Sequence, residues 1–151
     1  MSIGPRRIAE LLGRGRVVKR HLRVSGRREP IYVSPDAQLK YALPGQRGLD
    51  RDLIVVAEIF VSEGMAVWDV GANVGIFAIA AASRSGSGAV LAIEADPWLA
   101  ELIDRTRRHP KHRERSIQVL CAAISDSDGV DEFVIAERGR ASNALKGVGR
   151  S

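Results

Sequence analysis

The stretch that decides the fold is Val67-Trp68-Asp69-Val70-Gly71-Ala72-Asn73-Val74-Gly75-Ile76-Phe77. An apolar run ends in an acid, and glycines then bracket the start of a helix. Glycine lets the backbone turn tightly and approach a ligand without a Cβ in the way. The free N–H groups at the helix start favour a polar or anionic ligand group. This pattern predicts a buried strand that turns sharply into a nucleotide-binding type of loop.

The segments around this loop alternate between helical and extended patterns. Short apolar runs indicate strands, and capping residues with apolar residues at helical spacing indicate helices. The expected elements are a helix over 53–61, a strand over 65–70, a helix beginning near 74 or 75, a strand over 89–93, a helix from 97 and a strand over 117–124. This order predicts an α/β fold, with a parallel sheet, right-handed crossovers and helices on both faces.

Further local patterns predict smaller features. Ser34-Pro35-Asp36 is a turn signal, so residues 31–33 and 39–42 are expected to form a small hairpin. A fourth, antiparallel strand is expected over 132–135. The lone Cys121 lies in an apolar run, and we expect a buried, inert thiol.

Charge divides the 151-residue chain unevenly. Residues 1–30 hold nine Lys/Arg and two Glu, whereas the remainder holds fourteen Lys/Arg and sixteen Asp/Glu. We expect a basic amino-terminal arm over 1–48, one α/β domain over 49–146 and a disordered tail over 147–151. A basic arm is either a solvated surface or a binder of nucleic acid or anionic lipid through counterion release. No apolar run approaches the ~20 residues of a membrane span, and a cytoplasmic location is expected.

The spacing of the glycines in the loop limits the class of ligand that it can bind. Gly71-x-x-x-Gly75 is not the dinucleotide pattern G-x-G-x-x-G, and Asn73 would crowd two phosphates. Asp69 suits a cationic or amino-bearing ligand. Glu94 follows the next strand, where a carboxylate can accept hydrogen bonds from both ribose hydroxyls. Together these residues favour S-adenosylmethionine, which has a ribose, a sulfonium cation, an α-amino group and no phosphate.

The same residues resemble a known family. Val67–Gly75 is similar to the first motif of S-adenosylmethionine-dependent methyltransferases of the FkbM type, and Glu94-Ala95-Asp96-Pro97 is similar to their second. The segment Ala122-Ala123-Ile124-Ser125-Asp126, followed by Asp128-Gly129, Glu132-Phe133 and Ser142-Asn143, resembles the region after their third strand. The resemblance covers roughly residues 50–145.

The resemblance implies a Rossmann-like methyltransferase that methylates a hydroxyl group on a sugar, a polyketide or a similar small metabolite. The cofactor-binding residues that it implies are Asp69, Gly71, Ala72, Asn73, Gly75, Glu94, Ala95, Ala123 and Ile124. Of these, Asp69, Gly71, Asn73 and Gly75 would line the methionine part, Glu94 would hold the ribose, and Ala123 and Ile124 would lie near the adenine. Plainer roles are a helix-capping acid for Asp69 and a solvated strand end for Glu94. Asp96 is first of all a helix cap.

The chain also departs from the family pattern. Such domains continue with a fourth parallel strand beside the first, so we expect a domain truncated after its third strand plus one extra strand. The first strand would then be an exposed apolar edge, prone to self-association. No catalytic residue is assigned, and His109 with His112 lacks a third ligand for a metal. Two alternatives to an active methyltransferase stay open: a cofactor-binding remnant without catalysis, and a basic-arm protein that binds nucleic acid or a membrane surface.

Overall fold

The computed structural model describes residues 15–46, 48–126, 129, 132–135 and 144–145. The strands are β1 (Val18–Val24), β2 (Arg27–Val33), β3 (Val67–Val70), β4 (Ala89–Ile93), β5 (Ser116–Leu120), β6 (Phe133–Val134) and β7 (Ala144–Leu145). The helices are α2 (Arg51–Phe60), α3 (Ile76–Ser85) and α4 (Pro97–Arg107), with short 3-10 turns η1 (Leu39–Ala42) and η2 (Pro110–His112). The predicted basic arm before residue 15, Ser142-Asn143 and the tail lie outside the described residues.

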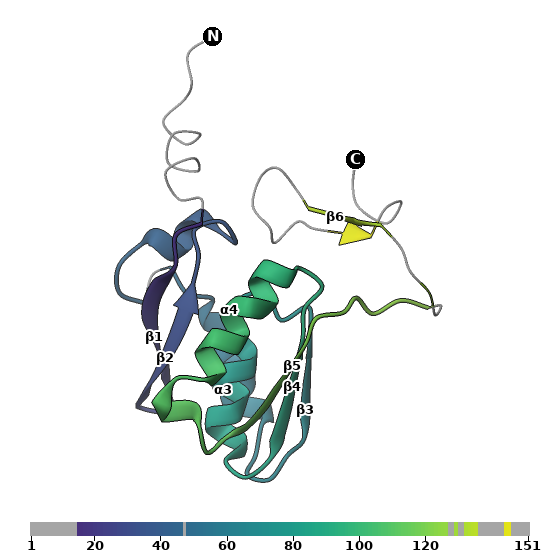
Figure 1. Ribbon diagram of the computed structural model, residues 1–151. Helices are drawn as coiled ribbons and strands as arrows, with labels where there is room; N and C mark the ends of the chain where they lie inside the picture. The colour runs from purple at the N-terminus through teal and green to yellow at the C-terminus, as the bar shows by residue number, and fades with distance from the viewer. Residues whose placement is uncertain (1–14, 47, 127–128, 130–131, 136–143, 146–151) are drawn as a thin grey trace.

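A parallel sheet of three strands, in the order β3-β4-β5, forms one layer of the molecule. In its register Val67 lies beside Val90, and Val90 lies beside Ile117. Helices α3 and α4 make the two crossovers and pack behind the sheet, and the hairpin of β1 and β2 forms a third layer beyond them (Figure 1). The predicted α/β fold with a parallel sheet is confirmed.

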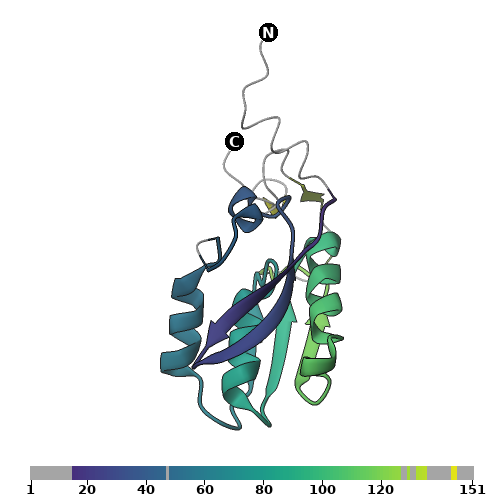
Figure 2. The same ribbon diagram turned by 90° about the vertical axis from the view of Figure 1, so that its left-hand side faces the viewer.

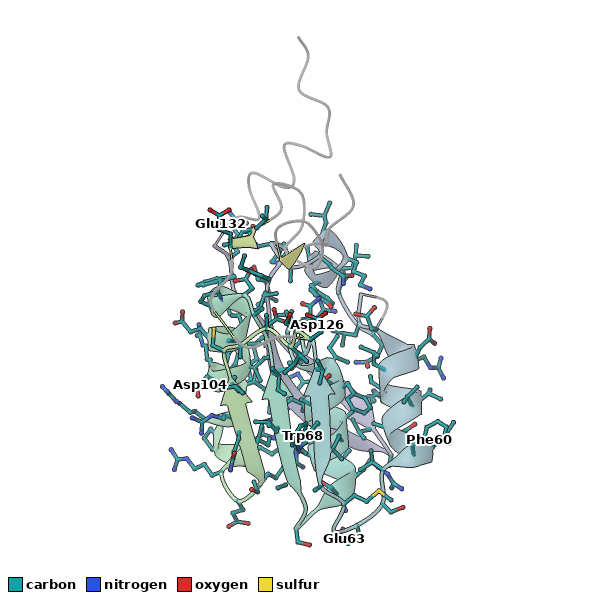
Figure 3. All side chains as sticks on the ribbon, turned by 90° about the vertical axis from the view of Figure 1, so that its right-hand side faces the viewer. Phe60, Glu63, Trp68, Asp104, Asp126 and Glu132 are labelled. Atoms are coloured by element: carbon teal, nitrogen blue, oxygen red, sulfur yellow. The ribbon has the colours of Figure 1, made fainter. Side chains whose placement is uncertain are left out.

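The helices of the described chain lie on one face of the sheet, not on both as predicted. Along β3, Val67 and Asp69 are half-buried, whereas Trp68 and Val70 are 71% and 57% exposed. Figure 3 looks onto this open face, with Trp68 on it, α3 and α4 behind the sheet and α2, labelled at Phe60, beside it. The pleat places alternate residues on opposite faces, so these apolar side chains meet solvent.

Helix α3 is the centre of the core because it is covered from both sides. It lies between the sheet and the β1–β2 hairpin (Figure 2), and only Phe77 and Arg84 among its residues are not buried. The small side chains of Ala78 and Ala80–Ala82 let both layers approach the helix closely. Helix α2 packs beside α3 and buries Ile54 and Ala57.

The hairpin predicted around Ser34-Pro35-Asp36 is wrong. The strands that pair are β1 and β2, joined by Ser25 and Gly26, whose φ angles are +47° and +79°. Two positive φ angles define the tight I′ turn, which matches the twist of a hairpin. Residues 39–42 form the 3-10 turn η1 instead.

Other local predictions also differ from the structure. Strand β5 ends at Leu120, and Cys121 just beyond it is exposed, so the predicted buried thiol is wrong. Residues of the expected fourth strand form β6, which pairs antiparallel with β7 in a separate two-stranded sheet. Within the described residues no helix is long and apolar enough to cross a membrane.

A buried ion pair fastens the hairpin to the helical layer. Glu29 of β2 is fully buried and accepts hydrogen bonds from Arg115 Nη2 at 2.8 Å and from Ser83 Oγ at 2.8 Å. Burial alone would raise the pKa of Glu29, but these hydrogen bonds and the charge of Arg115 outweigh burial and lower it. The neighbouring His112 donates from Nε2 to the carbonyl of Pro30 at 2.8 Å.

We expect Arg115→Ala to lower the free energy of unfolding by about 3 kcal/mol at pH 7, because the buried Glu29 loses the guanidinium that donates two hydrogen bonds to it. Because the pKa of Glu29 is lower in the folded chain than in the unfolded chain, its ionisation stabilises the fold at pH values above the unfolded-state pKa. This stabilisation is lost as the pH falls through the folded-state pKa. The decrease in the free energy of unfolding caused by Arg115→Ala should therefore be smaller at acidic pH. Urea titrations followed by circular dichroism measure it. Arg113→Ala, at an exposed neighbour, should cost less than about 0.5 kcal/mol. Equal losses in the two variants would contradict the assignment.

Candidate functional site

The loop between β3 and α3 contains three residues with positive φ: Gly71 at +75°, Asn73 at +53° and Gly75 at +83°. Gly75 is required for a second reason, since a Cβ there would lie 3.2 Å from Ile103 Cγ1. Asn is the residue other than glycine that enters this region most readily, because its short polar side chain can bond locally. The loop therefore turns sharply enough to start α3 directly at the end of the strand.

Backbone hydrogen bonds fix the loop to the end of β4. The N–H groups of Gly71 and Ala72 both donate to the carbonyl of Ile93, at 2.9 and 3.0 Å. The N–H of Gly75 donates to the carbonyl of Ala72 at 2.7 Å. These bonds hold the first and second strand ends side by side, which is where open parallel sheets bind ligands.

Glu94 connects this loop to the start of α4. It is 8% exposed, its Oε2 accepts from the N–H of Asn73 at 2.7 Å, and its Oε1 accepts from the N–H of Asp96 at 2.9 Å. Glu94 is thus a buried connector and not a solvated strand end. Each carboxylate oxygen can accept a second bond, so the group keeps capacity for a hydroxyl.

Asp69 lies at the carboxyl end of β3 beside the start of α3. Its Oδ2 accepts from the N–H of Ala78 at 2.9 Å, so it does satisfy a free group of the helix start. Burial raises the pKa of Asp69 from 3.8 to about 6, with a smaller contribution from the charge of Glu94, against the lowering effect of the Ala78 N–H. Keeping the Asp69 carboxylate charged at this strand end at neutral pH therefore lowers the stability of the fold.

The other predicted site residues lie farther from the β3–α3 loop or serve to cap a helix. Asp96 is a buried helix cap, because its Oδ1 accepts from the N–H of Trp98 at 2.9 Å. Ala95 is half-buried, and the N–H of Ala122 donates to the carbonyl of Glu94 at 3.2 Å. Ala123 and Ile124 are exposed, in a segment that leads away from the sheet after β5 (Figure 1). The structure therefore brings Asp69, residues 71–75 and Glu94 together, but not Ala123 and Ile124.

One functional group at this site is missed by pattern reading. Asn73 Oδ1 is buried and has no hydrogen-bond partner within the described residues. A buried acceptor without a donor is costly, and such an atom calls for a partner from outside the chain. The sequence indicated only that Asn73 would crowd two phosphates, and the unpartnered oxygen is a feature of the folded loop.

Two other features lie apart from this site. A cavity of about 380 Å³ opens between the β1–β2 turn and α2, lined by Arg23, Leu49, Ile54 and Glu58 among others. His109 and His112 have both ring nitrogens engaged, His109 with Lys19 Nζ and the Lys111 N–H, and His112 with the Pro30 carbonyl and Arg115. Neither feature contacts the β3–α3 loop.

Comparisons with known proteins give structural similarity alone. No family model and no curated protein matches the chain. Among solved structures it is similar to Trm5b from Pyrococcus abyssi, with 20% identity over 69% of this chain and 28% of that one, at a TM-score of 0.46. It is also similar to a SAM-dependent O-methyltransferase from Thermotoga maritima, with 22% identity over 74% of this chain and 44% of that one, at a TM-score of 0.47. The chain thus spans less than half the length of either protein, and we base its function on the site itself.

We expect Asp69→Asn to raise the free energy of unfolding by about 2 kcal/mol at pH 8, because it removes a charge held at a raised pKa. The folded state binds the proton more tightly, so the stability of the native chain should fall as pH rises from about 4 to about 6. The increase in the free energy of unfolding caused by Asp69→Asn should therefore become larger across this pH range. Urea titrations at several pH values measure it. Exposed Asp126→Asn should leave stability unchanged at every pH, and a destabilised Asp69→Asn chain would contradict the account.

Proposed function

We propose that this chain binds S-adenosylmethionine at the β3–α3 loop and belongs to a methyltransferase of the FkbM type. The observation that carries the proposal is the hydrogen bond from the Asn73 N–H to Glu94, which joins the two strand ends into one acidic site. A sharp loop after the first strand and a carboxylate after the second are the two parts that an adenosyl ligand needs.

The charges of the site support a cationic ligand without phosphate. Asp69 and Glu94 are the titratable groups at the loop, and both are acids that would repel a phosphate. Asn73 Oδ1 is a free acceptor suited to an ammonium group. S-adenosylmethionine carries a sulfonium and an α-ammonium, so its positive end would lower the cost of keeping Asp69 charged.

The residues would divide the ligand among them as follows. Asp69, Gly71, Ala72, Asn73 and Gly75 would line the methionine part, and at Gly71 the backbone is open, since a Cβ there would meet nothing within 4 Å. Glu94 would accept from the ribose hydroxyls with its remaining lone pairs, and Ala95 would lie beside it. Ala123 and Ile124 would reach the adenine only if the segment after β5 folds back over the loop.

The reaction that we propose is methylation of a hydroxyl oxygen on a sugar, a polyketide or a similar small metabolite. S-adenosylmethionine supplies the electrophilic methyl group, and the chain's residues would hold it in place, since methyl transfer depends mainly on positioning. A cofactor-binding chain without turnover is the second candidate. It is favoured by one observation: an oxygen of Asp69 and both oxygens of Glu94 already accept backbone N–H groups.

We expect isothermal titration calorimetry of the purified chain to detect S-adenosylmethionine, with Asp69→Ala and Glu94→Gln each raising Kd by about tenfold or more, as loss of a charge-assisted contact implies. Binding should also weaken below about pH 6, as Asp69 becomes protonated. Glu101→Gln, an exposed acid on α4, is the matched control.

Binding that is unchanged in both site variants, with their folding verified by circular dichroism, would overturn the site assignment. Methyl transfer from radiolabelled cofactor to hydroxylated metabolites then separates the two candidates, since a chain that binds without turnover gives a calorimetric signal and no labelled product.

We also propose that the edge of β3 pairs with a second copy of the chain. In the described sheet β3 has a neighbour on one side only, and Trp68 and Val70 are exposed beside the free edge. An apolar edge strand is a template for pairing with another strand, and a symmetric contact would close as a dimer.

Size-exclusion chromatography with light scattering should show a monomer–dimer equilibrium that shifts with concentration. A Trp68→Lys chain should stay monomeric at least tenfold higher in concentration, because a charge on the edge blocks pairing. Val134→Lys, at an exposed apolar residue of β6, should dimerise like the native chain. A native chain that is monomeric throughout would exclude this interface.

A further inference from the structure

The two faces of the β1–β2 hairpin differ in character. Inward-facing residues such as Leu22 and Ile31 are buried in the core, whereas the alternate positions place basic side chains outward. Cross-strand pairing sets Lys19 beside Tyr32 and Arg23 beside Arg28 on this outward side. The side faces the viewer in Figure 2, where the hairpin lies in front of α3.

Residues of α4 and η2 extend the outward side. The Arg105 guanidinium lies 4.4 Å from the centre of the Tyr32 ring. Lys19 Nζ lies 2.9 Å from His109 Nε2, and Lys111 Nζ donates to the carbonyl of Arg28. We define the basic face as Lys19, His21, Arg23, Arg28, Tyr32, Arg105, His109 and Lys111.

Most of these charges lack a carboxylate partner. Within the described part of the chain, Lys19, Arg23, Arg28 and Arg105 form no ion pair. By contrast, Arg107 on the other side of α4 pairs with Asp104 at 2.6 Å.

The closely spaced positive charges of the basic face affect the pKa of His21. Burial, then the positive charges of Arg28, Lys19 and Lys111, lower the pKa of His21. The basic face is therefore a region of uncompensated positive potential, built from three separate elements that the core holds in place.

Exposed apolar residues are absent from this face. The large exposed apolar side chains of the described residues lie at Leu43, on α2, over 65–70, and from Leu120 onward. Apolar side chains that insert below the headgroups strengthen peripheral membrane binding. A wholly polar, basic surface with one aromatic ring instead fits a polyanion in water.

We propose that the basic face binds single-stranded nucleic acid, with phosphates along Lys19, Arg23 and Arg28 and a base stacked on Arg105. Lys and Arg side chains bind phosphates by releasing counterions. A base can stack on an arginine plane, and the Tyr32 ring behind Arg105 holds that plane in position. This interaction is independent of the cofactor site, which lies at the carboxyl ends of the strands.

The experiment measures fluorescence anisotropy of a labelled RNA of about 16 nucleotides with the full chain, between about 50 and about 200 mM NaCl. The native chain should bind with a Kd that rises with salt. The triple variant Lys19→Gln/Arg23→Gln/Arg28→Gln should raise Kd by about tenfold or more and reduce the salt slope by about 2, since a single strand contributes about 0.7 per phosphate contact.

Two controls make the result specific to this face. Lys40→Gln/Arg51→Gln/Arg107→Gln removes the same charge elsewhere and should change Kd by less than about threefold. Arg105→Lys keeps the charge but loses the stacking plane, so it should raise Kd by about fivefold without changing the salt slope.

Three outcomes would overturn the proposal: no binding at about 50 mM NaCl, equal losses in the two triple variants, or an unchanged Kd for Arg105→Lys. Binding to phosphatidylserine–phosphatidylcholine vesicles with none to RNA would assign the face to membranes instead. Each variant is compared with the native chain by thermal unfolding, so that a loss of fold is recognised.

Discussion

The buried carboxylate of Glu94 is the interaction on which the site depends. Its side chain accepts from the loop after β3 and from the start of α4, and its backbone bonds on both sides to the chain at the end of β5. Three segments therefore meet at one residue. Because a buried polar group must find hydrogen-bond partners, burial of the Glu94 carboxylate holds the loop and the helix start in place.

Much of this arrangement could be predicted from sequence because its signals are local. Gly71 and Gly75 indicated a sharp strand-to-helix turn, and the angles at both residues confirm it. Asp96-Pro97 indicated a helix cap, and Asp96 does accept from the Trp98 N–H. Such features depend on a few neighbouring residues, so a single sequence carries the information. The joint role of Glu94 depends on chain segments twenty or so residues apart, and no local pattern contains it.

The hairpin could not be predicted because its inward face contains two charges. Strand patterns are recognised by apolar residues at alternate positions, but β1 places Arg20 inward and β2 places Glu29 inward. Arg20 donates to the carbonyl of Tyr41 at 2.8 Å, and Glu29 pairs with Arg115, so both charges are satisfied by distant segments. The partners are invisible in the local sequence, which therefore indicated only a basic arm. The order of the elements misled in the opposite direction: it indicated helices on both faces of the sheet, yet Trp68 is exposed.

The folding of this basic region changes what its charges can do. On a flexible arm the same arginines would be spread through solvent, and each contact would cost the entropy of ordering the chain. On the hairpin, Lys19, Arg23 and Arg28 are fixed by the pairing of β1 with β2 and by the Glu29–Arg115 ion pair underneath. The buried salt bridge thus does more than hold two layers together, because it keeps the outward cations close to one another despite their mutual repulsion. The acidic site at the strand ends and the basic face on the hairpin are then two preorganised surfaces of opposite charge, carried by one core around α3.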